Sequence, residues 1–150
     1  MRVVIQRVSE SSVSIDGEIV GSIQKGFMIL LGIENEDSID DIEWLVGKIS
    51  KLRIFSDEEG KMNLSIADIG GSFLVISQFT LHASTKKGNR PSYIKAARPE
   101  TAIPLYQEFM RRLHEVSGLP VESGEFGGDM KVSLINDGPV TIIIDSKSKE

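Results

Sequence analysis

The chain of 150 residues contains no cysteine and only two histidines. Without cysteine it forms no disulfide, thiolate nucleophile or sulfur-ligated metal site, and a reducing compartment costs it no stability. A catalytic zinc usually takes three protein ligands at fixed spacing, and His82 and His114 alone do not supply such a set. We therefore expect no metal site.

Long hydrophobic runs are also missing, since no segment approaches the roughly 20 apolar residues that cross a bilayer. The first residues alternate between polar and apolar types, whereas a signal peptide needs an uninterrupted apolar stretch. We therefore expect no membrane segment and a cytoplasmic location. The hydrophobic fraction of 40% and the charged fraction of 26% are typical of one globular domain with one core.

The net charge of -5 argues against a protein that coats DNA or RNA through its overall field. One stretch, from Ala83 to Arg98, nevertheless has no acidic residue and is rich in cations. These cations are Lys86, Lys87, Arg90, Lys95 and Arg98. Gly88 and Pro91 indicate a loop, which is either a solvated surface loop or a contact for phosphate.

The first third of the chain predicts strands joined by tight turns. Polar and apolar residues alternate over Val3 to Val8 and Ser12 to Ile15, and Asp16-Gly17 predicts a hairpin into Glu18 to Ile23. The unbroken apolar run from Phe27 to Ile33 is typical of a strand covered on both faces.

Two helices are expected from apolar residues at helical spacing. The first runs from Ile39 to Leu52, after a Ser38 and Asp41 pair that resembles a capping box. The second begins near Pro99, which suits a first helical position, and ends before Gly118.

Three further strands are predicted, at Ser72 to Leu81, Lys131 to Ile135 and Val140 to Asp145. The residues between the last two, 136 to 139, predict a turn, and residues 146 to 150 a loose tail. The fold class is therefore mixed α/β, in a single domain over residues 1 to 150. We expect a largely antiparallel, twisted, barrel-like sheet with two packed helices.

Strand alternation places Gln78 and Thr80 on one face of the predicted strand Ser72 to Leu81, and His82, the residue directly after it, on the same side. One face then gathers an amide, a hydroxyl and an imidazole. By itself, a threonine on a strand more often reflects β-propensity than catalysis.

Two segments, Ser77 to Leu81 (SQFTL) and Asn136 to Thr141 (NDGPVT), resemble the two signature segments of the D-aminoacyl-tRNA deacylases, also called D-tyrosyl-tRNA deacylases. The resemblance extends over essentially the whole chain. It includes Ile5 to Val8, Arg53 to Asp57, Gly60 to Leu64 and Arg90 to Ser92.

The resemblance implies an enzyme of chiral proofreading in translation, which hydrolyses the ester of D-aminoacyl-tRNA. It implies a homodimer with active sites at the subunit boundary, where the 3'-terminal adenosine binds, and it implies no cofactor. Gly138 and Pro139 match a cis pair that reaches into the partner's site. We expect rigid carbonyls beside the substrate Cα to exclude an L side chain there, and D-amino acids and glycine to be accepted.

Thr80 matches the family's traditional catalytic candidate, but a threonine hydroxyl is a poor nucleophile without a base. On a second route, backbone amides near Phe79 and Thr80 bind the oxyanion while the terminal 2'-hydroxyl assists. Both routes remain open. The resemblance also assigns Gln78 and Ser77 to the substrate and Met130 to the adenine pocket, with Arg7 bracing the Gly-Pro turn.

Because the resemblance implies tRNA as the substrate, we infer that Lys86, Lys87 and Arg90 meet acceptor-stem phosphates, although the resemblance itself assigns no role to these residues. An alternative is a non-catalytic RNA-binding or regulatory module on the same scaffold. An unrelated esterase would need a nucleophile and base that the sequence does not supply.

Overall fold

Strands and helices follow one another along residues 1–150, all of which the computed structural model describes. The strands are β1 (Arg2–Ile15), β2 (Glu18–Ile23), β3 (Gly26–Gly32), β4 (Phe55–Ser56), β5 (Met62–Leu64), β6 (Ser72–Ser77), β7 (Val121–Ser123) and β8 (Lys131–Asp145). The helices are α1 (Ile39–Lys51), α2 (Pro99–Ser117) and a short 3₁₀ helix, η1 (Phe79–His82). Neither α-helix combines the length and hydrophobicity that a membrane crossing requires.

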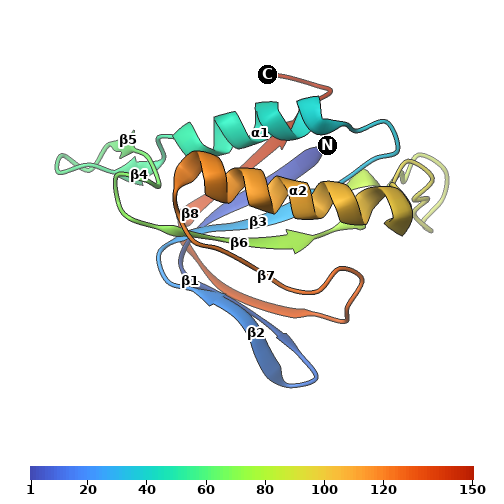
Figure 1. Ribbon diagram of the computed structural model, residues 1–150, viewed down its shortest axis with the longest axis horizontal. Helices are drawn as coiled ribbons and strands as arrows, with labels where there is room; N and C mark the ends of the chain where they lie inside the picture. Colours follow the sequence, from blue (N-terminus) through green and yellow to red (C-terminus); the bar gives the residue numbers. More distant parts are fainter.

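The long strand β1 organises the main sheet. Its first half pairs with β3, its second half pairs with β2, and its other edge pairs with β8, all antiparallel. From β3 the sheet continues through β6 to β7, and these two pairings are parallel. The expected mixed α/β fold with a largely antiparallel sheet is therefore confirmed, although one side of the sheet is parallel (Figure 1).

The sheet curls into a nearly closed barrel. Register shifts in β1, between Val13 and Ser14 and on either side of Val8, bend the strand away from the helices. The curl brings β2 against β7 so closely that a Cβ on Gly21 would lie 2.6 Å from the carbonyl oxygen of Ser123. Only glycine fits at this contact.

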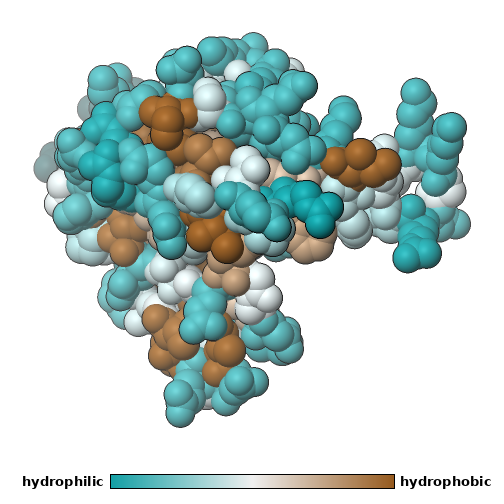
Figure 2. Space-filling model, turned by 45° about the vertical axis from the view of Figure 1, so that its right-hand side comes forward, coloured by the Kyte–Doolittle hydropathy of each residue, from teal (hydrophilic) through white to brown (hydrophobic).

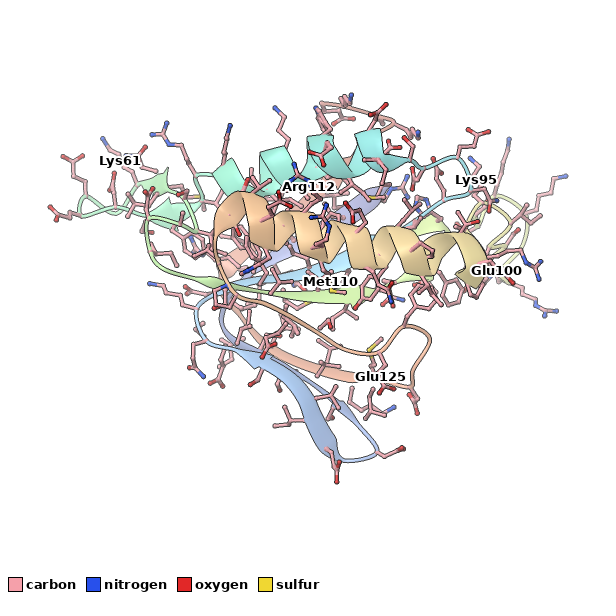
Figure 3. All side chains as sticks on the ribbon, viewed as in Figure 1. Lys61, Lys95, Glu100, Met110, Arg112 and Glu125 are labelled. Carbon is pink, nitrogen blue, oxygen red and sulfur yellow. The ribbon has the colours of Figure 1, made fainter.

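The main core lies between the sheet and the two α-helices, which cover the same face of the sheet (Figure 1). Helix α1 contributes buried Leu45 and Ile49, and α2 contributes buried Phe109 and Leu113. Arg112 lies between the helices and forms an ion pair with Glu43 (Figure 3). A second, smaller cluster fills the barrel, and it consists of Val8, Val13, Ile23, Met28, Leu74 and Ile76.

Several predicted elements match the structure closely. The hairpin of β1 and β2 turns at Asp16 and Gly17, which both have positive φ. Helix α1 begins at Ile39 and is capped by a hydrogen bond of 2.8 Å from the Ser38 amide to Asp41. Helix α2 begins at Pro99, and Gly118 ends it in the left-handed conformation.

The predicted turn at residues 136 to 139 is wrong, because β8 continues from Lys131 to Asp145 without reversing direction. Both halves of β8 pair with β1, which is long enough to take them in succession. Pro139, which lacks an amide donor, falls where the ladder skips residues, so no sheet hydrogen bond is lost. The separate strands expected at Val3 to Val8 and Ser12 to Ile15 likewise form one strand.

The tail is also better anchored than the sequence indicated. Ser146 is buried, and its hydroxyl donates to Asp41 at 2.6 Å and accepts from the terminal amine of Met1 at 3.0 Å. Lys147 lies 3.3 Å from the same Asp41 carboxylate. The short strands β4, β5 and β7 were not predicted.

Candidate functional site

The first signature segment lies where β6 ends. The ladder between β3 and β6 stops at the Leu31 and Ser77 pair, and the amide of Gln78 then donates to the carbonyl of Leu31 at 2.8 Å. Beyond Gln78 the chain tightens into η1, which packs back on Gly32. The predicted strand Ser72 to Leu81 is therefore wrong after Ser77, because β3 ends and provides no further partner.

The new geometry still brings Gln78 and Thr80 together. The Gln78 side-chain amide donates to the Thr80 hydroxyl oxygen at 2.5 Å, and both side chains are partly buried. An amide nitrogen is a donor and removes no proton, and the Thr80 hydroxyl has no other side-chain hydrogen bond. No general base therefore lies within hydrogen-bonding distance of Thr80.

The backbone of η1 offers donors at the same place. Its first hydrogen bond runs from the amide of Leu81 to the carbonyl of Gln78. The N–H groups of Phe79 and Thr80 precede that bond and have no partner within the helix. Two adjacent backbone donors suit a developing oxyanion.

His82 does not share a face with Gln78 and Thr80, which corrects the expectation from strand alternation. Its side chain is 3% exposed, and Nδ1 lies 3.6 Å from the carboxylate of Glu34. Nε2 has no hydrogen-bond partner. The 3₁₀ turn directs His82 into the interior, so it is not placed to act on the Thr80 hydroxyl.

A pocket of about 320 Å³ opens beside η1, and four site candidates named from the sequence line it. These are Ser77, Gln78, Phe79 and Met130. The other walls are mainly apolar and come from β3, α2 and the loop between β7 and β8. The one charged residue in the lining, Asp129, is exposed and forms an ion pair with Lys131, so the interior is nearly neutral.

Thr80, Gly138 and Pro139 do not line this pocket. A second hollow of about 270 Å³ lies between β1, β2 and β8, and it contains none of the signature residues. The pocket beside η1 is therefore the candidate site.

The loop from 126 to 129 supplies a wall that sequence reasoning missed, apart from its neighbour Met130. Phe126, Gly127 and Gly128 carry no catalytic motif, and only the folded chain brings them opposite η1. Glu125, which directly precedes this loop, lies below α2 in Figure 3. A glycine pair in a loop was the one available signal, and it indicates a turn, not a pocket wall.

The second signature segment forms an exposed bulge on β8. The Gly138-Pro139 peptide bond is cis, and Gly138 has φ +131°, a conformation that favours glycine. Arg7 is 8% exposed and donates to the carbonyls of Asp137 at 3.0 Å and Ile54 at 2.6 Å. The bulge is therefore tied to the body of the chain by a buried arginine, while Gly138 and Pro139 face outward.

The basic stretch forms a loop at the end of the molecule where α2 begins (Figure 1). Reciprocal backbone hydrogen bonds of 2.8 and 2.9 Å between Ser84 and Ser92 close its base. Lys86, Lys87 and Arg90 are exposed and form no ion pair, so their charges are uncompensated.

The chain is similar to known proteins over nearly its whole length. Residues 4–145 match the family described as D-Tyr-tRNA(Tyr) deacylase. D-aminoacyl-tRNA deacylases of Bacteroides fragilis and Flavobacterium johnsoniae are 66% and 58% identical over 150 residues, the full length of both chains in each comparison.

Two solved structures are also similar. One is described as c-Myc DNA Unwinding Element Binding Protein, at 40% identity and a TM-score of 0.90, covering 97% of this chain and 98% of that one. The other is described as a probable eukaryotic D-amino acid tRNA deacylase, at 18% identity and a TM-score of 0.81, covering 95% and 97%. The second likeness shows the fold alone. The chain belongs to the D-aminoacyl-tRNA deacylase family, whose members are hydrolases that act on an ester bond.

Proposed function

We propose that the protein hydrolyses the ester between a D-amino acid and the 3'-terminal ribose of tRNA, with the terminal adenosine in the pocket beside η1. The main support is the convergence of Ser77, Gln78, Phe79 and Met130 on one nearly neutral, mostly apolar pocket. A flat uncharged base suits such walls, and Gln78 provides the polar group that orients it. The family's activity carries over to this chain on that basis.

In the proposed reaction, water adds to the ester carbonyl carbon and the N–H groups of Phe79 and Thr80 receive the oxyanion. The bond to the ribose 3'-oxygen then breaks, and that oxygen takes up a proton. The neighbouring 2'-hydroxyl assists the proton transfers. Thr80 holds Gln78 through their 2.5 Å hydrogen bond and does not attack, because no base activates it.

The role of Thr80 is tested by initial rates of amino acid release from D-Tyr-tRNA. A positioning role predicts that Thr80→Ser retains most of the rate and that Thr80→Ala loses about tenfold. The wild-type rate should fall by far more than tenfold on a tRNA that ends in 2'-deoxyadenosine and carries the amino acid on its 3'-hydroxyl. A loss of about 10⁴-fold or greater in Thr80→Ala, with the deoxy substrate unaffected, would identify Thr80 as the nucleophile.

We also propose that two chains form a homodimer and that Gly138 and Pro139 of one chain complete the site of the other. The bulge is exposed, is braced by Arg7 and lies outside the pocket of its own chain, as a group presented to a partner must be. Its carbonyls would exclude an L side chain by contact. Glycine has no side chain to exclude, so glycyl-tRNA should be hydrolysed too.

Subunit complementation tests this arrangement. Gln78→Ala damages the pocket, and Pro139→Ala damages the chirality selector, which is the name we give to Gly138 and Pro139. Each variant homodimer should therefore be impaired in D-selective hydrolysis. A mixed dimer contains one intact pocket facing one intact selector, and it should recover D-selective hydrolysis at one site. Absence of recovery in a verified mixed dimer would show that each site uses its own chain's bulge.

The exposed loop cations Lys86, Lys87 and Arg90 are proposed to bind acceptor-stem phosphates. Binding becomes less dependent on salt when a cation that pairs with a phosphate is removed. The triple Gln variant should therefore bind tRNA less tightly and with a shallower slope against salt concentration. An unchanged slope would indicate that the loop is a solvated surface and does not bind phosphate. Action on tRNA is consistent with the proposed cytoplasmic location.

A further inference from the structure

Two aromatic side chains are exposed at the rim of the pocket. Phe79 is 53% exposed and Tyr93 is 38% exposed, and their rings meet edge to face with centroids 5.0 Å apart. The next residue, Ile94, is 86% exposed. By contrast, Phe27, Phe73 and Phe109 are fully buried. The exposed pair therefore contributes little to the core and leaves ring surface open to solvent.

Both rings project from backbone segments that hydrogen bonds hold in place. Phe79 is the first residue of η1 and lines the pocket, so the pair begins at the pocket wall. Tyr93 directly follows the hydrogen-bonded Ser84 and Ser92 bridge, and its carbonyl accepts from the amide of Ala96 at 3.0 Å. The pair thus forms an aromatic surface that leads from the pocket wall to the basic loop.

The loop that bears Tyr93 carries charges of one sign. From Ala83 to Arg98 the chain has five cations and no acidic residue. Lys95 shares a shallow hollow with Glu34 and Glu36, so the uncompensated charge comes mainly from Lys86, Lys87 and Arg90. Lys95 lies near the amino-terminal end of α2 in Figure 3, and Figure 2 shows mainly hydrophilic side chains around a small hydrophobic patch on the arm at the right.

We propose that Phe79 and Tyr93 form a stacking platform for the unpaired base that precedes the terminal adenosine of tRNA. Exposed aromatic rings beside uncompensated cations are the combination by which proteins bind single-stranded nucleic acid, with stacking on the rings and phosphates on the cations. Because the two rings lie at the rim of the pocket that holds the terminal adenosine, the base that reaches them is that of the preceding nucleotide. This inference rests on the proposed function, which places the terminal adenosine in the pocket.

Tyr93→Ala and Tyr93→Phe form the matched pair that tests the platform. The alanine variant removes the ring and the phenylalanine variant keeps it, and Tyr93 does not line the pocket. We expect Tyr93→Ala to raise KM for D-Tyr-tRNA about tenfold with kcat unchanged, as loss of one stacked base predicts. Tyr93→Phe should behave as the wild type.

The 3'-D-tyrosyl ester of adenosine, which has no preceding nucleotide, is the control substrate. Its hydrolysis should be equal in the wild type and both variants. An unchanged KM for tRNA in Tyr93→Ala, or an equal loss on the adenosine ester, would overturn the platform.

A binding assay that involves no hydrolysis distinguishes failure of this inference from failure of the proposed function. Fluorescence anisotropy of a labelled, uncharged CCA trinucleotide should show about tenfold weaker binding to Tyr93→Ala than to Tyr93→Phe, even if the wild type hydrolyses no ester. Equal binding would contradict the platform. Sedimentation tests one further alternative. If Tyr93→Ala is monomeric while the wild type and Tyr93→Phe are dimers, the aromatic pair forms a subunit contact and the platform is overturned.

Discussion

Replacement of Arg7 by alanine should affect both the stability of the fold and the selection of substrate chirality. The guanidinium is nearly buried and donates to two carbonyls, of Ile54 at 2.6 Å and Asp137 at 3.0 Å. A hydrogen bond from a charged group contributes about 1.5 to 3 kcal/mol. After allowance for the desolvation that alanine avoids, we expect a loss of about 3 kcal/mol in the free energy of unfolding.

Urea unfolding, followed by the fluorescence of the single Trp44, measures this loss. With a typical m-value of about 2 kcal/mol per molar, the midpoint should fall by roughly 1.5 M. Arg112→Ala is the matched control, because Arg112 forms a more exposed ion pair with Glu43 and its removal should lower the urea midpoint far less.

The proposed chirality selector, Gly138 and Pro139, should respond as well, since the Asp137 carbonyl that Arg7 binds lies directly before Gly138. Hydrolysis rates on D-Tyr-tRNA and L-Tyr-tRNA under native conditions should converge in Arg7→Ala and remain separate in Arg112→Ala. If Arg7→Ala retained both the urea midpoint and the D to L ratio of the wild type, the bracing role assigned to Arg7 would be refuted.

Three further results are expected. Burial raises the pKa of Asp41, but hydrogen bonds from Ser146, the Ser38 amide and Lys147 outweigh it and lower the pKa from 3.8 to about 2. Because the folded-state pKa lies below the unfolded one, about 2 kcal/mol of stability should be lost as pH falls from about 4 to 2, and urea midpoints of Asp41→Asn should lack this component. Phe109→Ala should lower the free energy of unfolding by about 3 to 5 kcal/mol, measured by the same titration, because the ring is fully buried. Dialysis against EDTA should leave the hydrolysis rate unchanged, since no cluster of potential metal ligands exists.

Local patterns were sufficient for the elements whose signals lie within one segment. The Asp16-Gly17 turn, the apolar spacing of α1 and the Pro99 and Gly118 limits of α2 each depend on nearby residues, and the structure confirms them. Strand β7, with three residues, is too short to show alternation.

The errors share a different physical cause, which is that strands end and bend according to their partners. The residues after Ser77 have β-propensity, yet the chain turns there because β3 ends. Pro139 indicates a turn locally, but β1 is long enough to pair with the chain on both sides of it. The lengths of the partner strands β3 and β1 cannot be deduced from the sequence of the segment that pairs with them.

The candidate site was only partly predictable for the same reason. The signature segments identified Ser77, Gln78 and Phe79, which the pocket brings together with Met130. The contact between Gln78 and Thr80 exists, but it arises from the 3₁₀ turn and not from strand alternation. Tyr93 was missed, because an exposed aromatic in a basic loop gains its meaning only from the Phe79 ring beside it.

The most direct test of the central claim is the release of amino acid from D-Tyr-tRNA and L-Tyr-tRNA by the purified protein, measured side by side. Rapid hydrolysis of the D ester with the L ester spared is the predicted result. Survival of both esters would contradict the proposed activity and favour a binding module on the same scaffold. Cleavage of both would contradict the selecting role of Gly138 and Pro139.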